Sequence, residues 1–98
     1  MSQKEETKFK EKVQKDLKKL KNVWSIKTQE RSRRGTPDLI ICYAGIFIAI
    51  ELKTDIGVID KLQFETLKKI RASGGYAFTS CPSQWEMHYQ IIKSLGEK

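Results

Sequence analysis

The chain lacks the features that mark several classes of protein. Its 98 residues include only two cysteines, Cys42 and Cys81, without metal-ligand spacing, so we expect reduced thiols rather than a disulfide or a zinc site. The longest apolar stretch, 39–50, is interrupted by Gly45 and is too short to cross a bilayer. The polar N-terminus is unlike a signal peptide or a membrane anchor. We therefore expect a cytoplasmic protein (in the host cell if it is viral) with no membrane partner.

Repeats, proline-rich linkers and low-complexity tails are also missing, and histidine occurs once. The length suits one domain over residues 1–98, with a modest core. His88 is expected to be a packing or surface residue rather than a ligand or a base. Trp24, Trp85 and the other aromatic residues are expected in the core more often than as platforms for stacked bases.

Basic residues outnumber acidic residues in this chain. Lysines and arginines number 19 against 12 acidic residues, which gives a formal net charge of +7. This balance favours a polyanionic partner, with nucleic acid as the first candidate. A small lysine-rich protein that is merely soluble is the competing interpretation.

Apolar periodicity predicts a mixed sheet flanked by helices. Phe9, Val13, Leu17 and Leu20 recur at helical spacing, and Ala44-Gly45 is typical of a hairpin turn. The expected elements are a helix over 5–21, strands over 23–28, 38–43 and 46–53, a helix over 59–72 ended by two glycines, a strand over 76–79, and a last helix opened by a capping box at Ser83–Glu86. The order α-β-β-β-α-β-α indicates an α/β fold with about four strands.

Three charged residues at the ends of apolar strands carry the functional signal. Asp38 follows Gly35-Thr36-Pro37, and Glu51 and Lys53 end the next strand, where alternation places them on one face. Mg²⁺ takes oxygen ligands, typically one or two carboxylates with water and substrate. The set therefore predicts a divalent-metal site with a lysine beside it. Such a site can catalyse phosphodiester hydrolysis. The competing interpretation is a buried ion pair, which contributes little stability.

Two further residues are candidates for the same site. Gln63 lies near the start of the second predicted helix, on the face of Leu67 and Ile70, and its amide could bond Lys53 or a water at the metal. Its alternative is an ordinary polar residue near a helix start. Glu6 shares the inward face of the first helix, whereas Glu11 points away. A carboxylate that complements the helix dipole is the alternative for Glu6.

Basic residues precede the predicted metal site. Lys27, Arg31, Arg33 and Arg34 lie within or just before a polar loop that leads to Asp38. This position suits contacts to phosphates on either side of a scissile bond. The lysines of the first helix are weaker evidence, because a charged helix face is usually only solvated.

The ordered motifs resemble a known nuclease superfamily. Gly35-Thr36-Pro37-Asp38, then Glu51-Leu52-Lys53, then Gln63 are similar to the PD-(D/E)xK nucleases. Within that superfamily the chain resembles the small stand-alone virus-type replication-repair nuclease (VRR-NUC) domains of phages and bacteria. The resemblance extends over roughly Glu5 to Pro82 and includes Phe47–Ile50 and Gly74–Ala77.

The resemblance implies metal-dependent DNA cleavage with a restriction-endonuclease-like core. Asp38, Glu51 and the main-chain carbonyl of Leu52 would bind Mg²⁺ or Mn²⁺, with Glu6 as the acid from the first helix. Lys53 would be the catalytic lysine and Gln63 the accessory amide. Such domains are typically homodimers that act in DNA repair on branched DNA such as Holliday junctions. No organic cofactor is expected.

Two alternatives to a structure-selective endonuclease remain open. A sequence-specific restriction-type or nicking endonuclease shares the same chemistry, but the chain has no obvious extra recognition segment. A non-catalytic basic DNA-binding module would use the acids and the lysine only as ion pairs. Nothing in the residues excludes an RNA substrate.

Overall fold

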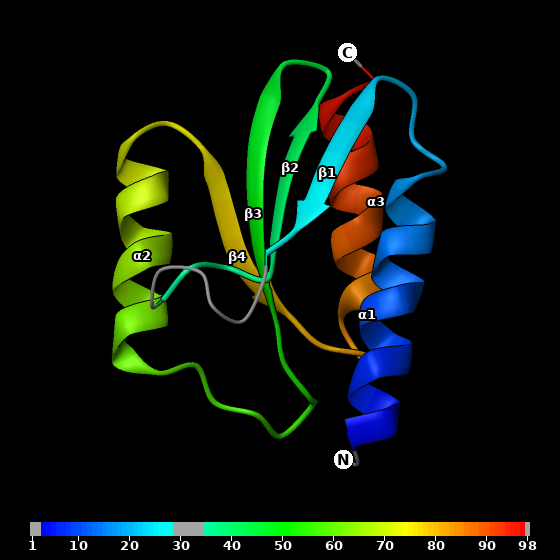
Figure 1. Ribbon diagram of the computed structural model, residues 1–98. Coiled ribbons are helices and arrows are strands. Elements are labelled where there is room, and N and C mark those ends of the chain that lie inside the picture. Colours follow the sequence, from blue (N-terminus) through cyan, green and yellow to red (C-terminus); the bar gives the residue numbers. More distant parts are fainter. Residues whose placement is uncertain (1–2, 29–34, 98) are drawn as a thin grey trace.

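A four-stranded sheet with helices on both faces forms the body of the protein in the computed structural model, which describes residues 3–28 and 35–97. Figure 1 shows the sheet between two helices on one side and one helix on the other. The elements in chain order are α1 (Gln3–Leu17), β1 (Val23–Lys27), β2 (Leu39–Tyr43), β3 (Ile46–Leu52), α2 (Lys61–Ala72), β4 (Tyr76–Ser80) and α3 (Trp85–Leu95). The predicted α/β class and the predicted order of elements are confirmed.

The strands follow one another across the sheet in the order β1-β2-β3-β4. The first three are antiparallel neighbours, and β4 runs parallel to β3 because α2 supplies the crossover between them. Ala44 and Gly45 form the predicted hairpin turn, with φ values of 51° and 83°. Positive φ at both positions suits the right-handed twist of the two strands that they join.

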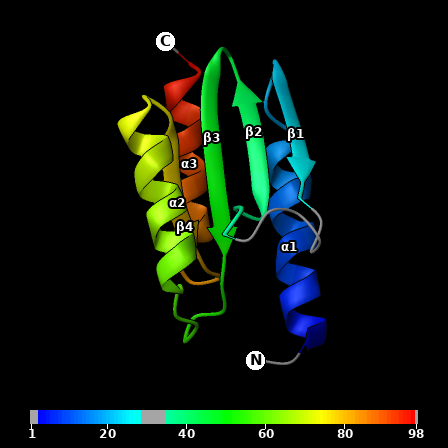
Figure 2. The same ribbon diagram turned by 60° about the vertical axis from the view of Figure 1, so that its left-hand side comes forward.

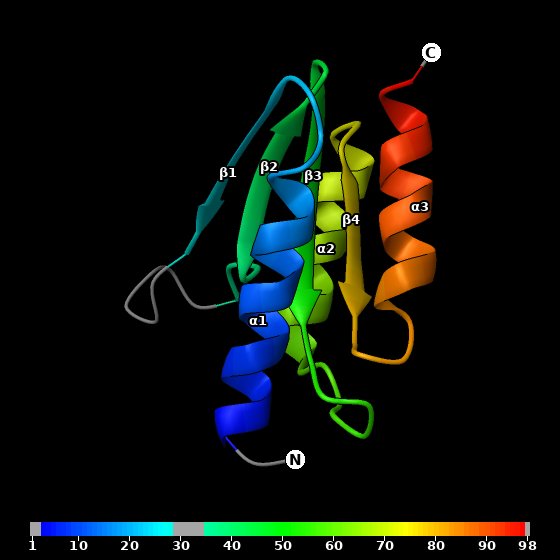
Figure 3. The same ribbon diagram turned by 90° about the vertical axis from the view of Figure 1, so that its right-hand side faces the viewer.

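The main core lies between the sheet and the helix pair α1 and α3, which stand side by side (Figures 1 and 3). Every member of the predicted apolar stripe is buried there, including Leu20 just beyond the end of α1. Trp85 and Ile92 of α3 are buried against the same cluster, and Tyr89 packs on Trp85 with ring centroids 5.8 Å apart. The helical periodicity therefore identified the buried face of α1.

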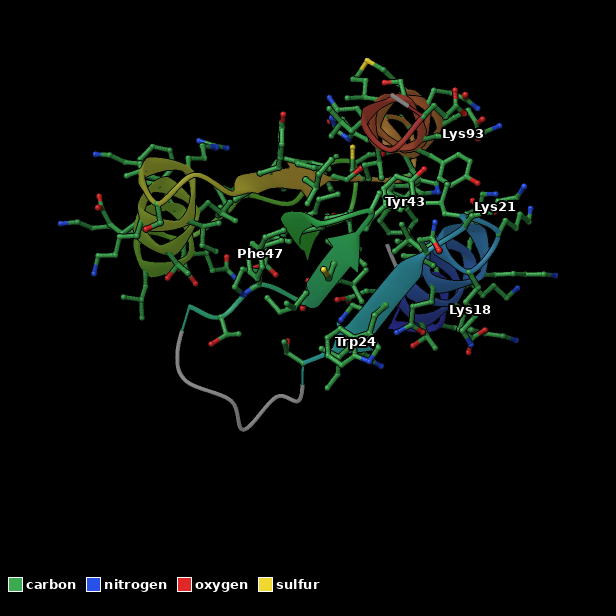
Figure 4. All side chains as sticks on the ribbon, turned by 90° about the horizontal axis from the view of Figure 1, so that it is seen from above. Lys18, Lys21, Trp24, Tyr43, Phe47 and Lys93 are labelled. Carbon is green, nitrogen blue, oxygen red and sulfur yellow. The ribbon has the colours of Figure 1, made fainter. Side chains whose placement is uncertain are left out.

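Among the described elements, α2 alone covers the opposite face. A helix is about 10 Å wide and strands lie about 4.8 Å apart, so one helix shields about two strands. Ala49, Leu67 and Ala77 form the small core beneath α2, with Ile40 of β2 packed against it, and Figure 2 shows β1 beyond the reach of α2. Trp24 on β1 is therefore 61% exposed, and its predicted place in the core was wrong. Figure 4 shows Trp24 and Phe47 away from α1 and α3.

Helix α2 begins with a capping box that the sequence interpretation missed. It starts at Lys61 rather than at the predicted Ile59, with Asp60 as its N-cap. The Asp60 carboxylate accepts a hydrogen bond from the Gln63 N–H at 2.8 Å, and the Gln63 side-chain oxygen accepts one from the Asp60 N–H at 3.1 Å. Reciprocal bonds of this kind satisfy two N–H groups at the helix start.

The capping box predicted at Ser83 does not form. The N-cap of α3 is Gln84, and its side chain makes no capping hydrogen bond. The Ser83 N–H instead donates to Asp55 at 2.9 Å, which joins the loop after β3 to the loop after β4. Because Asp55 binds the Ser83 N–H, this group is not available for the local capping box.

The remaining expectations concern single residues. His88 is a packing residue: its Nδ1 lies 2.7 Å from Ser80 Oγ, and its ring is 4.8 Å from that of Phe78. Cys42 and Cys81 are both free thiols. Among the described helices, none is long and apolar enough to span a bilayer.

Candidate active site

Asp38 and Glu51 meet at one end of the sheet because of the β2–β3 register. Leu39 pairs with Ile50, so the position before Leu39 lies opposite the position after Ile50. Directly opposed residues of antiparallel strands place their side chains on the same face. The two carboxyls consequently share the face that carries α2, and the proximity predicted from the sequence is present.

Backbone hydrogen bonds hold Asp38 in place. Its main-chain oxygen accepts from the Thr28 N–H at 2.9 Å, which ties it to the end of β1. Its side-chain Oδ2 accepts from the Leu52 N–H at 2.7 Å, so the carboxylate is anchored to β3 as well. Asp38 is therefore fixed between two strands, with its orientation set by main-chain groups.

Gly35 allows the segment before Asp38 to pass close to α2. Its φ of +82° is a conformation that residues with a side chain seldom adopt. A Cβ at this position would lie 2.9 Å from both Leu62 Cγ and Thr66 Oγ1. Both conformation and space therefore require glycine at this position upstream of Asp38.

Glu51 is the least satisfied acidic group among the described residues. Glu51 is 2% exposed. Its side-chain Oε2 is buried and has no hydrogen-bond partner in the described parts of the chain. Burial and the adjoining Asp38 carboxyl raise the pKa of Glu51 to about 9. A carboxyl with this pKa is mostly protonated at neutral pH unless a cation compensates its charge.

Two lysines bring positive charge to the carboxyl pair. Lys53 follows Glu51 by two positions and is half-buried, and its charge opposes the rise in the Glu51 pKa. Lys10 of α1 acts on Glu51 in the same direction. Lys53 was predicted, whereas Lys10 was missed. Its one sequence signal is its place four residues after the inward-facing Glu6.

Glu6 does not join Asp38 and Glu51 as a third carboxylate. Its Oε1 lies 3.5 Å from Lys10 Nζ, in an ion pair along α1. Across residues 3–28 and 35–97, no cluster of three or more acidic, histidine or cysteine side chains is arranged to hold a metal. The structure thus gives Glu6 a lysine partner instead of the predicted place beside the two acids.

Gln63 is engaged at the start of α2. Its side-chain oxygen is bonded to the Asp60 N–H, so the interpretation as an ordinary helix-start residue accounts for that atom. In the part of the chain that the structure describes, no hydrogen bond joins Gln63 to Lys53. The role of an accessory amide stays a prediction for its remaining NH₂ group.

Of the four residues predicted to contact DNA, the structure describes only Lys27. Lys27 is exposed at the end of β1, one residue before the Thr28 that holds Asp38. It pairs with Leu39 in the sheet, so its side chain starts from the face opposite the two carboxyls, and its contact with DNA stays a prediction. Arg31, Arg33 and Arg34 lie outside the described residues.

The donor set fits a small divalent cation. Two carboxyls lie side by side, and one buried oxygen of Glu51 has no partner among the described groups. The Leu52 N–H points toward Asp38, and because the N–H and C=O of one strand residue face the same neighbour, its carbonyl lies on that side too. Two carboxylates with a carbonyl suit Mg²⁺ or Mn²⁺, with water and substrate completing the shell.

Comparison with protein families, with curated proteins and with solved structures found no match to this chain. The resemblance carried by the motifs between Gly35 and Gln63 therefore stays a prediction from the sequence.

Proposed function

We propose that the protein is a Mg²⁺- or Mn²⁺-dependent endonuclease that hydrolyses phosphodiester bonds in DNA, with selectivity for branched DNA such as Holliday junctions. The proposal rests on one observation above all: the buried, partly unpartnered carboxyl of Glu51 beside Asp38 at the end of the sheet. A structural carboxylate would be expected to have its oxygens satisfied within the protein.

The residues of the site have separate roles in this proposal. Asp38, Glu51 and the Leu52 carbonyl hold the cation, which supplies charge neutralisation for the phosphate and lowers the pKa of a water molecule. Lys53, on the same strand face as Glu51, orients the attacking water and stabilises the negative charge that develops in the transition state. Burial of the pair reduces the screening of these charges by solvent.

Selectivity for shape rather than for sequence follows from the size of the chain. The four strands and three helices of the described residues offer little surface for reading bases, whereas lysines and arginines exceed acidic residues by seven. Contacts with the phosphate backbone carry no direct sequence information. We propose recognition through backbone and geometry, in a DNA-repair role in the cytoplasm. A homodimer would provide two sites related by a twofold axis for paired cuts.

The direct test incubates the purified protein with Mg²⁺ or Mn²⁺ and a panel of linear, flapped, forked and four-way DNAs. We expect cleavage of the branched substrates by the wild type. Asp38→Ala, Glu51→Ala and Lys53→Ala should abolish cleavage while DNA binding persists, and loss of either acid should even strengthen binding by removing repulsion. Glu11→Ala, on the outward face of α1, is the matched control and should cut normally.

The same experiment separates the alternatives. Cleavage of linear duplex at defined sequences would favour a restriction-type or nicking enzyme. DNA binding with no cleavage, together with a calorimetric titration that shows no divalent-ion binding with or without DNA, would favour a non-catalytic module. Cleavage that survives all three alanine substitutions would refute the assignment of the site.

A further inference from the structure

Lys10 differs from Lys12 of α1 and from Lys19 just beyond its end, whose ion pairs are also described. Its side chain is 26% exposed, whereas those of Lys12 and Lys19 are 61% and 64% exposed. The preceding residue, Phe9, belongs to the same core cluster as Leu52, the residue after Glu51. Figures 1 and 3 show that β3 ends at the level of the middle of α1, and Lys10 is the middle residue of this helix, which runs from Gln3 to Leu17. The helix therefore carries this lysine against the end of the sheet.

The partners of these lysines also differ. Lys12 and Lys19 each lie 3.3 Å from Asp16, a buried carboxylate whose charge they offset. Lys10 pairs only with Glu6 among the described acids within ion-pair distance, at 3.5 Å, and Glu6 is itself 45% exposed. A solvent-accessible pair of this kind contributes little stability, so Lys10 can exchange Glu6 for a stronger anion. The charge of Lys10 is also close enough to interact with that of Glu51.

We propose that Lys10 is a phosphate-binding residue of the site, a second cation that contacts the DNA backbone from α1 while Lys53 acts from β3. Glu6 is the positioning residue that directs Lys10 toward the end of the sheet. This inference rests on the proposed function for its substrate. It replaces the expectation that α1 contributes a metal-binding acid. In this proposal α1 contributes the phosphate-binding Lys10, and Glu6 positions Lys10 through their ion pair.

The first test measures DNA binding without divalent metal, in the presence of a chelator, as a function of salt. Each phosphate contact by a lysine contributes about 0.9 to the slope of log affinity against log salt. Lys10→Gln should lower the slope by about 1 and weaken binding roughly fivefold to tenfold at about 0.1 M salt. Lys10→Arg should retain the slope. Circular dichroism verifies that each variant folds.

Lys18→Gln is the matched control, because Lys18 is an exposed lysine of the same chain segment just beyond the last turn of α1. We expect its affinity to change less than twofold. Equal losses in Lys18→Gln and Lys10→Gln would reveal only a general charge effect and overturn the proposal. An unchanged slope in Lys10→Gln would also overturn it.

The second test examines Glu6 through metal binding rather than cleavage. Glu6→Gln should leave the Mn²⁺ dissociation constant within about twofold of the wild type, because Glu6 is not a ligand in this proposal. In a double-mutant cycle, Glu6→Gln should change DNA affinity only when Lys10 is present. A tenfold or greater loss of Mn²⁺ affinity would restore Glu6 as a third ligand and refute its positioning role.

The outcomes distinguish this inference from the proposed function. Phosphate contact by Lys10 is measured without metal, so it can be detected in a protein that never cuts DNA. Absence of cleavage with an intact Lys10 effect would refute the nuclease and leave the contact standing. Normal cleavage and normal salt dependence in Lys10→Gln would refute the contact and leave the nuclease standing.

Discussion

Two buried carboxylates in this small protein differ in how fully their oxygens are hydrogen-bonded. Asp16, between α1 and α3, is 6% exposed, and Glu51, at the end of β3, is 2% exposed. Asp16 accepts a hydrogen bond from Trp85 Nε1–H at 2.9 Å and is bound by Lys12 and Lys19. Burial by itself would raise the pKa of Asp16, but these hydrogen bonds outweigh it and the pKa lies below the usual value.

Glu51 has no comparable set of partners. One of its oxygens is unpartnered within the described residues, and its nearest acidic neighbour, Asp38, adds repulsion to the cost of burial. Asp16 thus joins two helices, whereas Glu51 has one buried oxygen that no described group binds and that can accept from a ligand. Burial alone does not distinguish a structural acid from a functional one; the completeness of its partners does.

The sharpest test of this contrast replaces Glu51 by its neutral isostere. Glu51→Gln should reduce metal-dependent DNA cleavage by about a thousandfold or more, because a cation ligand is lost. The melting temperature at pH 8 should be unchanged or higher, because no charge has to be buried. Cleavage rates and thermal unfolding measured on the same preparation provide the check. A large drop in melting temperature would mean that Glu51 is structural after all.

Asp16→Ala should give the opposite result. We expect a loss of about 3 kcal/mol in the free energy of unfolding, because the Trp85 N–H stays buried without an acceptor and the charged contacts are removed. Asp16→Asn, which retains an acceptor, should lose less. Urea unfolding measures both variants. Cleavage per folded molecule should match the wild type, and a selective loss of activity would contradict the division of roles.

The two acids should also give opposite dependences of stability on pH. The pKa of Glu51 is raised from 4.5 to about 9, so its contribution to stability is complete below about pH 4.5 and is lost as pH rises toward 9. The pKa of Asp16 is lowered, so its contribution is present above about pH 3.8 and is lost as pH falls through its folded-state pKa.

Both pH dependences can be tested by measuring the free energy of unfolding of the metal-free protein across this pH range. Glu51→Gln should flatten the alkaline decline, and Asp16→Asn should flatten the acidic one. Mn²⁺ should stabilise the wild type more at pH 8 than at pH 6, because protons compete with the cation for the carboxyls. The opposite order would argue against a metal at this pair.

The smallest expected effect concerns Gln63. Its oxygen already has a partner in the capping box, so Gln63→Ala should cost about 0.5 to 1 kcal/mol of stability. Asp60→Ala should cost about 1 kcal/mol by removing the other half of the box. If Gln63 acts only as a cap, both variants should cut DNA equally well. A cleavage defect in Gln63→Ala alone would establish its NH₂ group as part of the site.

Local sequence patterns predicted much of the fold. The spacing from Phe9 to Leu20 identified the buried stripe beside α1, and Ala44-Gly45 identified a two-residue turn. Such a turn fixes the antiparallel register, and with it the position of Asp38 opposite Glu51. The core of the candidate site could therefore be found without coordinates.

Partners from distant parts of the chain could not be found in this way. Ser83 has the local pattern of a cap, but Asp55 takes its N–H. Trp24 has the composition of a core residue, but α2 is too narrow to cover β1. Glu6 has the spacing of an inward-facing acid, but its side chain is 45% exposed and pairs with Lys10.

The sequence by itself determined the order of the elements, the faces that they bury and the meeting of two carboxyls at one end of the sheet, since period and turn length act over a few residues. Only the tertiary structure decided which buried acid is satisfied. Asp16 finds Trp85 at a separation of 69 residues, and Glu51 finds no such donor in the described chain. The packing of remote elements supplies those donors, and no local pattern records it.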